Sequence, residues 1–288
     1  MSTASRIRHS FAGKLARQMI HGLYHVKHPN GKPVKYQLPG EIKIELYPEG
    51  EIAEFLAFPQ IFEQAELASV YAYLKPGMKV VDVGANIGLY SIFAQKVVGE
   101  TGSVWAFEPS LETFQRLERN LALNECHQVK ALRMGLGNKS NATLQLKSDH
   151  GFGDAYRYLA EPDNSSDSPL EGERVLVTTL DEWAQANDIG PIDFLKIDIE
   201  GGEYKMLLGS QWLLRSSPHL VVLFESDPQW CERAACSQQD SFRILESLGF
   251  HLYAWNKRSK QWVTDEAALL NAGMVWASAA QSTLPRIP

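Results

Sequence analysis

The sequence contains few cysteines and no long apolar segment, and each absence excludes a class of protein. Its three cysteines, Cys126, Cys231 and Cys236, are too few for a disulfide framework and lack the paired CxxC spacing of a zinc site. No run of about 18 apolar residues occurs, so no membrane-spanning helix is predicted. These features favour a protein of the reducing cytoplasm.

Acidic residues are absent from the first 40 positions. This segment holds seven of the 28 Lys and Arg residues and none of the 34 Asp and Glu residues. A basic segment therefore precedes a strongly acidic remainder. The acidic excess argues against nucleic acid as a partner of the main body.

The basic segment predicts an amphipathic helix, because Ile7, Phe11, Leu15 and Met19 recur at every fourth position, the spacing of one helical face. Three interpretations remain open. The helix packs on its own domain or on a second subunit of a homodimer, it lies on an anionic membrane surface as a peripheral contact, or it is an organelle transit peptide.

A hairpin is predicted after this helix. The strand-like segments 43–46 and 52–55 flank the turn residues Pro48, Glu49 and Gly50, a pattern typical of two antiparallel strands. The helix and the hairpin form a predicted extension over residues 1–60, ahead of a larger domain over residues 61–288.

The larger domain alternates between buried strands and helices. Seven apolar strand-like runs follow Gly77, at residues 79–83, 103–107, 129–133, 194–197, 220–224, 250–254 and 274–277. This rhythm predicts an α/β fold with a doubly wound, mainly parallel, seven-stranded sheet. Residues 138–180 interrupt it, and there the segments 142–147 and 174–178 predict an added antiparallel pair.

A glycine-containing turn follows the first buried strand of this domain. The stretch runs from Asp82 through Gly84, Ala85 and Asn86 to Gly88 and then into a helix. Gly84 permits a tight turn, and Gly88 lets a ligand or a neighbouring strand come close. We expect backbone N–H groups at the N-terminus of the following helix to face a ligand at the carboxyl edge of the sheet. These five residues are candidate cofactor-binding residues.

Asn86 replaces the middle glycine of the GxGxxG pattern of nicotinamide enzymes. A pyrophosphate therefore has less room to approach the backbone, so a dinucleotide oxidoreductase is the weaker alternative. A ligand with adenosine and no phosphate fits better. Glu108, at the end of the second strand and 24 positions after Gly84, agrees with this choice, because a carboxylate there accepts hydrogen bonds from ribose hydroxyls.

The chain resembles the FkbM-like family of S-adenosylmethionine-dependent methyltransferases. The resemblance is carried by the segments 82–88, 106–109, 179–181 and 195–201, with Asn120 and Asn124 in addition. It implies a class I methyltransferase (Rossmann-like) sheet with S-adenosylmethionine across its first strands. By the same resemblance, Gly84 lies by the methionine moiety, Glu108 binds the ribose, and the turn at Gly135 and Leu136 borders the adenine.

Two acids end the fourth strand and are the first catalytic candidates. Asp198 and Glu200 share one face of an extended strand. Such a pair suits a general base for a hydroxyl, or the binding of a divalent cation, although no dedicated metal site is predicted. In the alternative, Glu200 caps the following helix and Asp198 orients its neighbours. Glu225, which ends the fifth strand, is a lesser candidate.

His150 is a rival base in a loop beside Gly151 and Phe152, where a loop histidine is otherwise simply solvated. The tryptophans are expected in the core. For Trp230 and Trp255, which lie near the ends of predicted strands, the alternative is that their rings form the floor of a sugar-binding site.

The fourth strand does not end in the Asn/Asp-Pro-Pro-aromatic pattern of many amine methyltransferases. The acids found there instead favour an oxygen acceptor, and the resemblance suggests a sugar hydroxyl of a glycan, glycolipid or glycosylated natural product. We therefore predict an O-methyltransferase. The alternatives are a methyltransferase for a non-sugar small molecule and a non-catalytic, methyltransferase-like binding module.

Overall fold

The computed structural model describes residues 33–47, 64–148, 157–161, 173–256, 259, 261–279 and 284. The predicted helix around residues 7–19, the predicted strand 52–55 and the candidate base His150 lie outside these residues. The same holds for the predicted domain boundary after residue 60, which stays a prediction.

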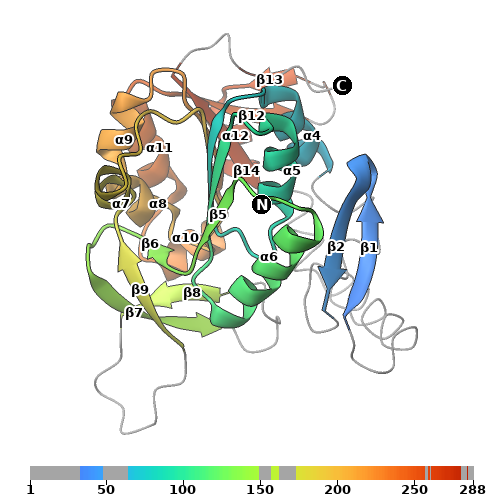
Figure 1. Ribbon diagram of the computed structural model, residues 1–288. Helices are drawn as coiled ribbons and strands as arrows, with labels where there is room; N and C mark the ends of the chain where they lie inside the picture. Colours follow the sequence, from blue (N-terminus) through green and yellow to red (C-terminus); the bar gives the residue numbers. More distant parts are fainter. Residues whose placement is uncertain are drawn as a thin grey trace, which may run out of the picture.

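A central sheet of eight strands organises the larger domain (Figure 1). In spatial order its strands are β13 (Gln261–Val263), β12 (His251–Asn256), β14 (Met274–Ser278), β11 (Val221–Glu225), β10 (Phe194–Ile197), β3 (Lys79–Val83), β4 (Ser103–Phe107) and β5 (Val129–Leu132). The five strands from β11 to β5 run parallel. Strand β14 is antiparallel to both of its neighbours, β11 and β12.

The predicted count of seven strands is wrong by one strand. The seven predicted runs all form strands, with ends within two residues of those expected. The eighth strand, β13, pairs with β12 in an antiparallel hairpin. It has only three residues and is partly exposed, so it lacks the buried apolar run that marks the other strands. Trp262 of β13 packs on Trp255 and Trp276, with ring centroids 5.2 and 5.5 Å away.

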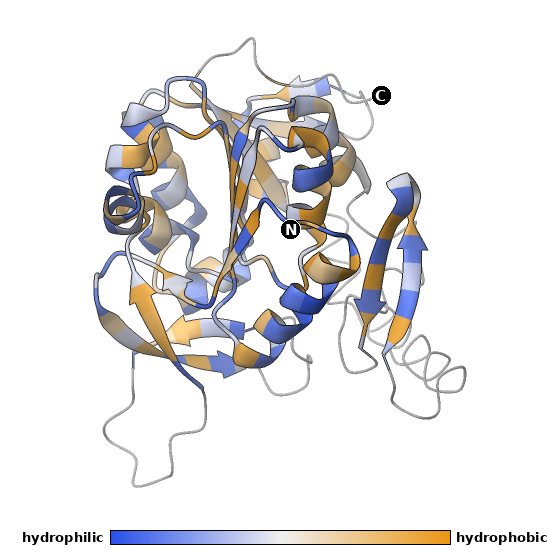
Figure 2. Cartoon of the chain, in the orientation of Figure 1, coloured by the Kyte–Doolittle hydropathy of each residue, from blue (hydrophilic) through white to orange (hydrophobic). Residues whose placement is uncertain are grey.

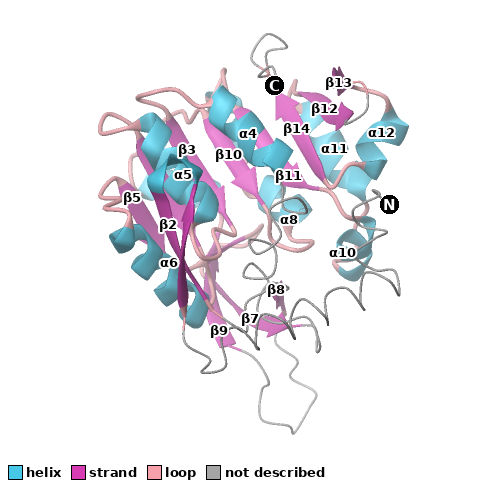
Figure 3. Ribbon diagram, turned by 90° about the vertical axis from the view of Figure 1, so that its right-hand side faces the viewer, coloured by secondary structure: helices cyan, strands magenta, loops and turns pink. Residues whose placement is uncertain are grey.

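Helices cover both faces of the sheet (Figures 1 and 3). One layer holds α4 (Gln64–Tyr73), α5 (Leu89–Val98) and α6 (Leu111–Leu123), and the other holds α7 (Leu180–Ala186), α8 (Glu203–Leu208), α9 (Gln211–Ser216) and α11 (Gln238–Ser247). The pleat of each strand sends alternate side chains to opposite faces. Val80 accordingly packs with α4 and α5, while Val81 belongs to the core on the other face. Figure 2 shows apolar strands between helices whose outer sides are polar.

A hairpin lies beside α6 at the edge of the domain (Figure 1). Its strands are β1 (Val34–Leu38) and β2 (Ile42–Leu46), joined by the short 3-10 turn η1 (Pro39–Glu41). The predicted strand 43–46 therefore exists and pairs with the segment before it. Ile42, Ile44 and Leu46 are buried in the core cluster that includes Leu117 of α6.

Asn120 and Asn124 of α6 hold this hairpin. The Asn120 Oδ1 accepts from the Glu45 N–H at 2.7 Å, and the Asn124 Oδ1 accepts from the Lys43 N–H at 2.8 Å. The two amides thus take the place of a further strand along β2. The Asn120 Nδ2 also donates to the carbonyl of Ile87 at 3.0 Å, which ties α6 to the glycine turn.

A second, smaller sheet lies beneath the central one in Figure 1. Its order is β6 (Gly135–Leu136), β9 (Glu173–Thr178), β7 (Ala142–Ser148) and β8 (Arg157–Ala160). The predicted antiparallel pair is confirmed as β7 and β9. Glu173 accepts from the Leu111 N–H at 3.0 Å, and Arg157 donates to the hydroxyls of Ser110 and Thr113. The small sheet is therefore anchored at the start of α6.

Within the described part of the chain, no helix combines the length and the apolar character needed to cross a bilayer.

Candidate active site

A cavity of about 600 Å³ lies where the carboxyl ends of the parallel strands meet the small sheet. Its walls come from four places: the glycine turn with Glu108, strand β6, the residues of β7 and β8, and the segment after β10 with Glu225 and Arg233. In α/β sheets, ligands bind at the carboxyl ends of the strands. The fold therefore predicts a ligand in this cavity.

Six of the eight predicted cofactor-binding residues line the cavity: Gly84, Ala85, Asn86, Glu108, Gly135 and Leu136. The other two, Asp82 and Gly88, are not among the lining residues. Asp82 is 1 % exposed and accepts a hydrogen bond from the Ser91 hydroxyl at 2.6 Å. Asp82 therefore lies behind the residues that line the cavity.

The turn at Gly84 requires glycine for two reasons. Its φ is +76°, and a Cβ at this position would lie 1.9 Å from the carbonyl oxygen of Asp198. Gly84 therefore lets the turns after β3 and β10 touch. At Gly88, with φ +94°, an added Cβ would lie 2.6 Å from a Leu117 methyl carbon, so the close neighbour there is helix α6 and not a strand.

Three N–H groups of the turn that precedes α5 are hydrogen-bonded within the protein. The Gly84 and Ala85 N–H groups donate to the Phe107 carbonyl at 3.0 and 2.9 Å, and the Asn86 N–H donates to Glu108. The physical reason is that the turn folds back on the end of β4. These N–H groups are therefore not available to cradle a phosphate, which agrees with a ligand that has none.

Glu108 is held by fixed backbone donors. It is 8 % exposed, and its two carboxylate oxygens accept from the N–H groups of Asn86 and Ser110, both at 3.0 Å. Burial raises its pKa to about 7, although these two hydrogen bonds and the positive charge of Arg157 favour the ionised form. Each carboxylate oxygen accepts more than one hydrogen bond, so a diol can still bind to this carboxylate.

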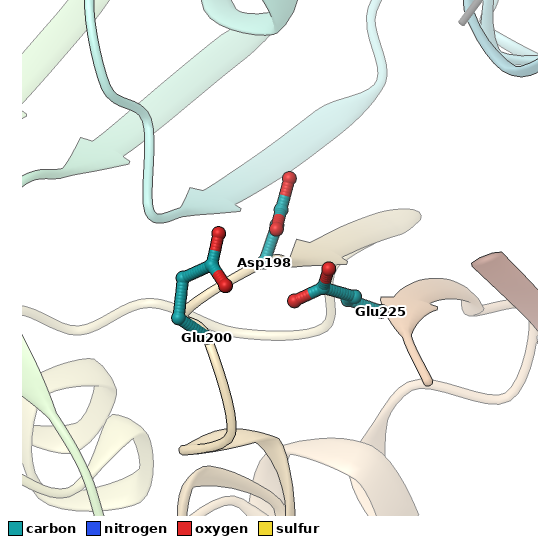
Figure 4. Close-up of side chains that lie close together, drawn as sticks. All are labelled: Asp198, Glu200 and Glu225. Carbon is teal, nitrogen blue, oxygen red and sulfur yellow. The ribbon is translucent and has the colours of Figure 1, made fainter. Parts of the chain in front are cut away.

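Three carboxylates meet on the other side of the cavity. Oxygen atoms of Asp198, Glu200 and Glu225 lie within 4.8 Å of one another, and the three side chains point together (Figure 4). Burial, and then the negative charges of Glu200 and Asp198, raise the pKa of Glu225 well above its ordinary value. Its buried Oε2 accepts no hydrogen bond from the residues that the structure describes. The cluster therefore favours holding a proton or a positive charge.

Asp198 and Glu200 come together for a different reason from the one expected. Strand β10 ends at Ile197, so the pleat does not place them on one face. Glu200 instead has a left-handed backbone, with φ +55°, and its carbonyl accepts from Arg233 at 2.6 Å. The Glu203 carboxylate secures this turn by accepting from the N–H groups of Ile199 and Gly201 at 3.0 and 3.3 Å. Burial raises the pKa of Glu203 to about 7.

Lys196 is a site residue that the sequence reasoning missed. Its ammonium lies 3.2 Å from the Asp198 Oδ2 and 3.7 Å from the Asp82 Oδ1, and it donates to the Gly84 carbonyl at 3.4 Å. A lysine is almost never fully buried unless it is paired. Its position inside the apolar segment Phe194–Ile197 was therefore a readable signal of acidic partners.

Arg233 closes one end of the site. Its guanidinium lies over the ring of Tyr158 from β8 at 3.8 Å and over the ring of Trp230 at 4.5 Å. Trp230 is buried in this stack and is absent from the cavity lining, as is Trp255. Both tryptophans therefore pack within the protein, as first expected, and neither floors the cavity.

Comparison with protein families identifies the chain. The model of the methyltransferase FkbM domain matches residues 82–252, which is more than half of the 288 residues. The chain belongs to the FkbM methyltransferase family. The family match and the order of the central strands establish a class I, S-adenosylmethionine-dependent methyltransferase, as the sequence motifs had predicted.

The chain is also similar to individual FkbM relatives. It is 27% identical to methyltransferase sdnD of Sordaria araneosa over 67% of this chain and 80% of that protein. It is 28% identical to the 31-O-demethyl-FK506 methyltransferase FkbM of Streptomyces tacrolimicus, over 63% of this chain and 73% of that one. The hexuronic acid methyltransferase AglP of Haloferax volcanii is 27% identical over 49% of this chain and 53% of its own length.

Among solved structures, a SAM-dependent methyltransferase from Aquifex aeolicus is similar to this chain. Its TM-score is 0.40 at 17% sequence identity, and the match covers 74% of this chain and 87% of that one.

Proposed function

We propose that this FkbM methyltransferase transfers the methyl group of S-adenosylmethionine to a hydroxyl group of a sugar, in a glycan, glycolipid or glycosylated natural product. One observation carries the proposal: a single cavity has the backbone-held carboxylate of Glu108 on one side and the cluster Asp198, Glu200 and Glu225 on the other. The first side suits a ribose diol, and the second suits removal of a proton from a hydroxyl.

The lining residues fit S-adenosylmethionine as the bound donor. Glu108 would hold the ribose, the turn at Gly84 would adjoin the methionine, and Gly135 with Leu136 would border the adenine. Leu144, Leu146 and Leu159 of the small sheet add an apolar wall to the same cavity. When bound, the donor supplies a methyl group on a positively charged sulfur.

The chain itself contributes position, charge and a proton acceptor. The cavity walls hold the acceptor hydroxyl beside the methyl donor, and proximity of this kind supplies much of the rate enhancement of enzymes. Asp198 or Glu200 accepts the hydroxyl proton as the oxygen becomes acidic. A low-dielectric cavity strengthens the attraction between opposite charges that develop there.

The names of two relatives support an oxygen acceptor. One relative is called a 31-O-demethyl-FK506 methyltransferase and another a hexuronic acid methyltransferase. The name of the hexuronic acid methyltransferase supports a sugar as the acceptor. The name of the 31-O-demethyl-FK506 methyltransferase favours our second candidate, a hydroxyl outside a sugar.

We propose that a divalent cation is not required. Asp198, Glu200 and Glu225 offer the oxygen ligands that Mg²⁺ and Ca²⁺ prefer. However, Lys196 already neutralises Asp198, and the raised pKa of Glu225 favours its neutral form. Treatment with EDTA should therefore leave methyl transfer unchanged. Loss of transfer that Mg²⁺ restores would instead identify these three acids as ligands.

The assay with labelled S-adenosylmethionine tests the proposal. The labelled donor is incubated with separate fractions of small glycans, glycolipids and sugar-free hydroxyl compounds, with wild-type protein and with Asp198→Asn. We expect the wild type, but not Asp198→Asn, to transfer label into a sugar-containing fraction. Label only in the sugar-free fraction would favour the second candidate, and donor binding without any transfer would favour a binding module.

We also propose that the protein is cytoplasmic and that the chain divides after residue 60. The basic N-terminal residues would contact a membrane surface or a second subunit.

A further inference from the structure

Lys196 is a buried cation in the middle of a parallel sheet. Its side chain is 4 % exposed, and its strand is otherwise apolar and buried on both faces. Removing an ammonium group from water costs several kcal/mol unless it is paired and hydrogen-bonded. Its presence therefore calls for an explanation from the groups around it.

The ammonium joins three separate segments of the site. It reaches the carboxylate of Asp82 in β3, the carbonyl of Gly84 in the turn, and the carboxylate of Asp198 after β10. Tyr90 of α5 presents its ring to the same ammonium, 4.8 Å from the ring centroid. A positive charge at the meeting point of three segments fixes their relative positions.

The two acidic partners differ in exposure. Asp82 is enclosed and also bonded to Ser91, whereas the Asp198 side chain is 27 % exposed and lines the cavity. The Asp198 Oδ2 is the nearer partner, at 3.2 Å against 3.7 Å for Asp82. Lys196 thus connects an enclosed, fixed acid to the acid that faces the reacting groups.

We propose that Lys196 is a positioning residue for methyl transfer, which holds the Asp198 carboxylate at one place on the cavity wall. The inference rests on the proposed function. Without this cation, the negative charge of Asp198 keeps the acid Glu200 as a close neighbour in the cluster, and the repulsion between the two carboxylates displaces it. A displacement of about 1 Å in an active site can cost about a hundredfold in rate.

A merely structural role for Lys196 makes a different prediction. In that case the lysine serves only to neutralise the buried Asp82. Removing both charges together then restores the stability, the cofactor affinity and the transfer rate of the wild type. Breaking a buried pair by removing one partner is strongly destabilising, whereas replacing both partners by neutral groups is often tolerated. The double variant Asp82→Asn with Lys196→Met therefore separates the two roles.

The experiment compares Lys196→Met, the double variant and the control Lys79→Met with the wild type. Lys79 begins β3 at the opposite edge of the same sheet and lies outside the cavity lining. Three quantities are measured: the melting temperature, the Kd of S-adenosylhomocysteine by calorimetry, and the transfer rate at saturating labelled S-adenosylmethionine into the fraction that accepts label.

We expect Lys196→Met to melt at a lower temperature and the double variant to recover wild-type stability and S-adenosylhomocysteine affinity. Transfer by the double variant should nevertheless remain about a hundredfold below wild type, while Lys79→Met transfers normally. Wild-type transfer by the double variant would overturn the inference, as would its failure to fold or a loss of affinity as large as the loss of rate. A wild type that binds no S-adenosylmethionine would instead refute the proposed function.

Discussion

Glu108 and the Asp198, Glu200 and Glu225 cluster lie on the same edge of the sheet, yet their surroundings differ. Glu108 receives one backbone N–H on each oxygen, from donors that the fold holds in place. In the cluster, three acidic side chains lie close together, and the Lys196 ammonium lies beside Asp198. Both regions are acidic, and the hydrogen bonds of Glu108 are already arranged by the backbone.

This difference separates binding from reaction. A carboxylate with fixed hydrogen-bond partners is pre-organised to hold a ligand. A cluster of close acids shares protons readily, because two like charges at short range raise the proton affinity of one of them. The comparison is the reason that we propose donor binding on the Glu108 side and proton transfer on the Asp198 side.

Asp198→Asn breaks the reacting side and should have the largest effect. The amide cannot accept the hydroxyl proton, so transfer at saturating donor should fall by about 10²- to 10⁴-fold. Donor affinity should stay near wild type, since Glu108 is untouched. Asp188→Asn, at an exposed left-handed position that Asn tolerates, is the control for loss of one acid. Unchanged turnover in Asp198→Asn would remove Asp198 from the mechanism.

Gly84→Ala tests the contact between the two sides, because Gly84 touches the Asp198 carbonyl. Gly249→Ala is the matched control, with φ +86° and no atom within 4 Å of the added Cβ. The control should lose about 1–2 kcal/mol from left-handed strain alone, and Gly84→Ala about 1–3 kcal/mol more from the clash. Urea unfolding measures both. Equal losses would show that the two turns are not in contact.

Glu203→Gln sharpens the comparison, because Glu203 also receives two backbone N–H groups. Its folded pKa, about 7, lies above the ordinary value of 4.5. Such a group contributes stability that is fully present below pH 4.5 and lost as the pH rises through 7. Wild-type stability should therefore fall across this window, and the variant's should fall less, by at most about 3 kcal/mol.

Denaturant unfolding of Glu203→Gln and wild type at pH 4.5, 6 and 7.5 measures this slope. Parallel curves for the two proteins would contradict the raised pKa of Glu203.

The pH dependence of donor affinity should show the smallest effect. Glu108 has a pKa of about 7, and only its ionised form accepts hydrogen bonds from both ribose hydroxyls. Affinity for S-adenosylmethionine should therefore rise as the pH increases through 7, by about tenfold at most for each pH unit. Calorimetry on wild type and Glu108→Gln from pH 6 to 8 isolates this contribution. A rise of equal size in the variant would assign it to other groups.

Much of this arrangement was predictable from the sequence. Apolar runs predicted seven of the eight central strands, and the acids at strand ends predicted their common edge. The three-residue β13 was missed because it is too short to show a period. Lys196 was missed because its role depends on Asp82, more than 100 positions away, which the sheet order alone brings near.

The left-handed turn at Glu200 was also beyond a sequence prediction. Its geometry depends on Arg233, 33 positions later in the chain, and no local pattern indicates that contact. The use of the Gly84 and Ala85 N–H groups by Phe107 likewise follows from how the turn folds against β4. In each case, contacts distant in the sequence determined what local residues do.

The central claim is that the Glu108 side of the cavity binds the methyl donor. Calorimetric titration with S-adenosylmethionine tests it most directly, using wild type, Glu108→Ala and the control Glu118→Ala, an exposed acid of α6. We predict micromolar binding to wild type and control, and no measurable binding to Glu108→Ala. Equal binding by all three proteins, or none by the wild type, would contradict the claim.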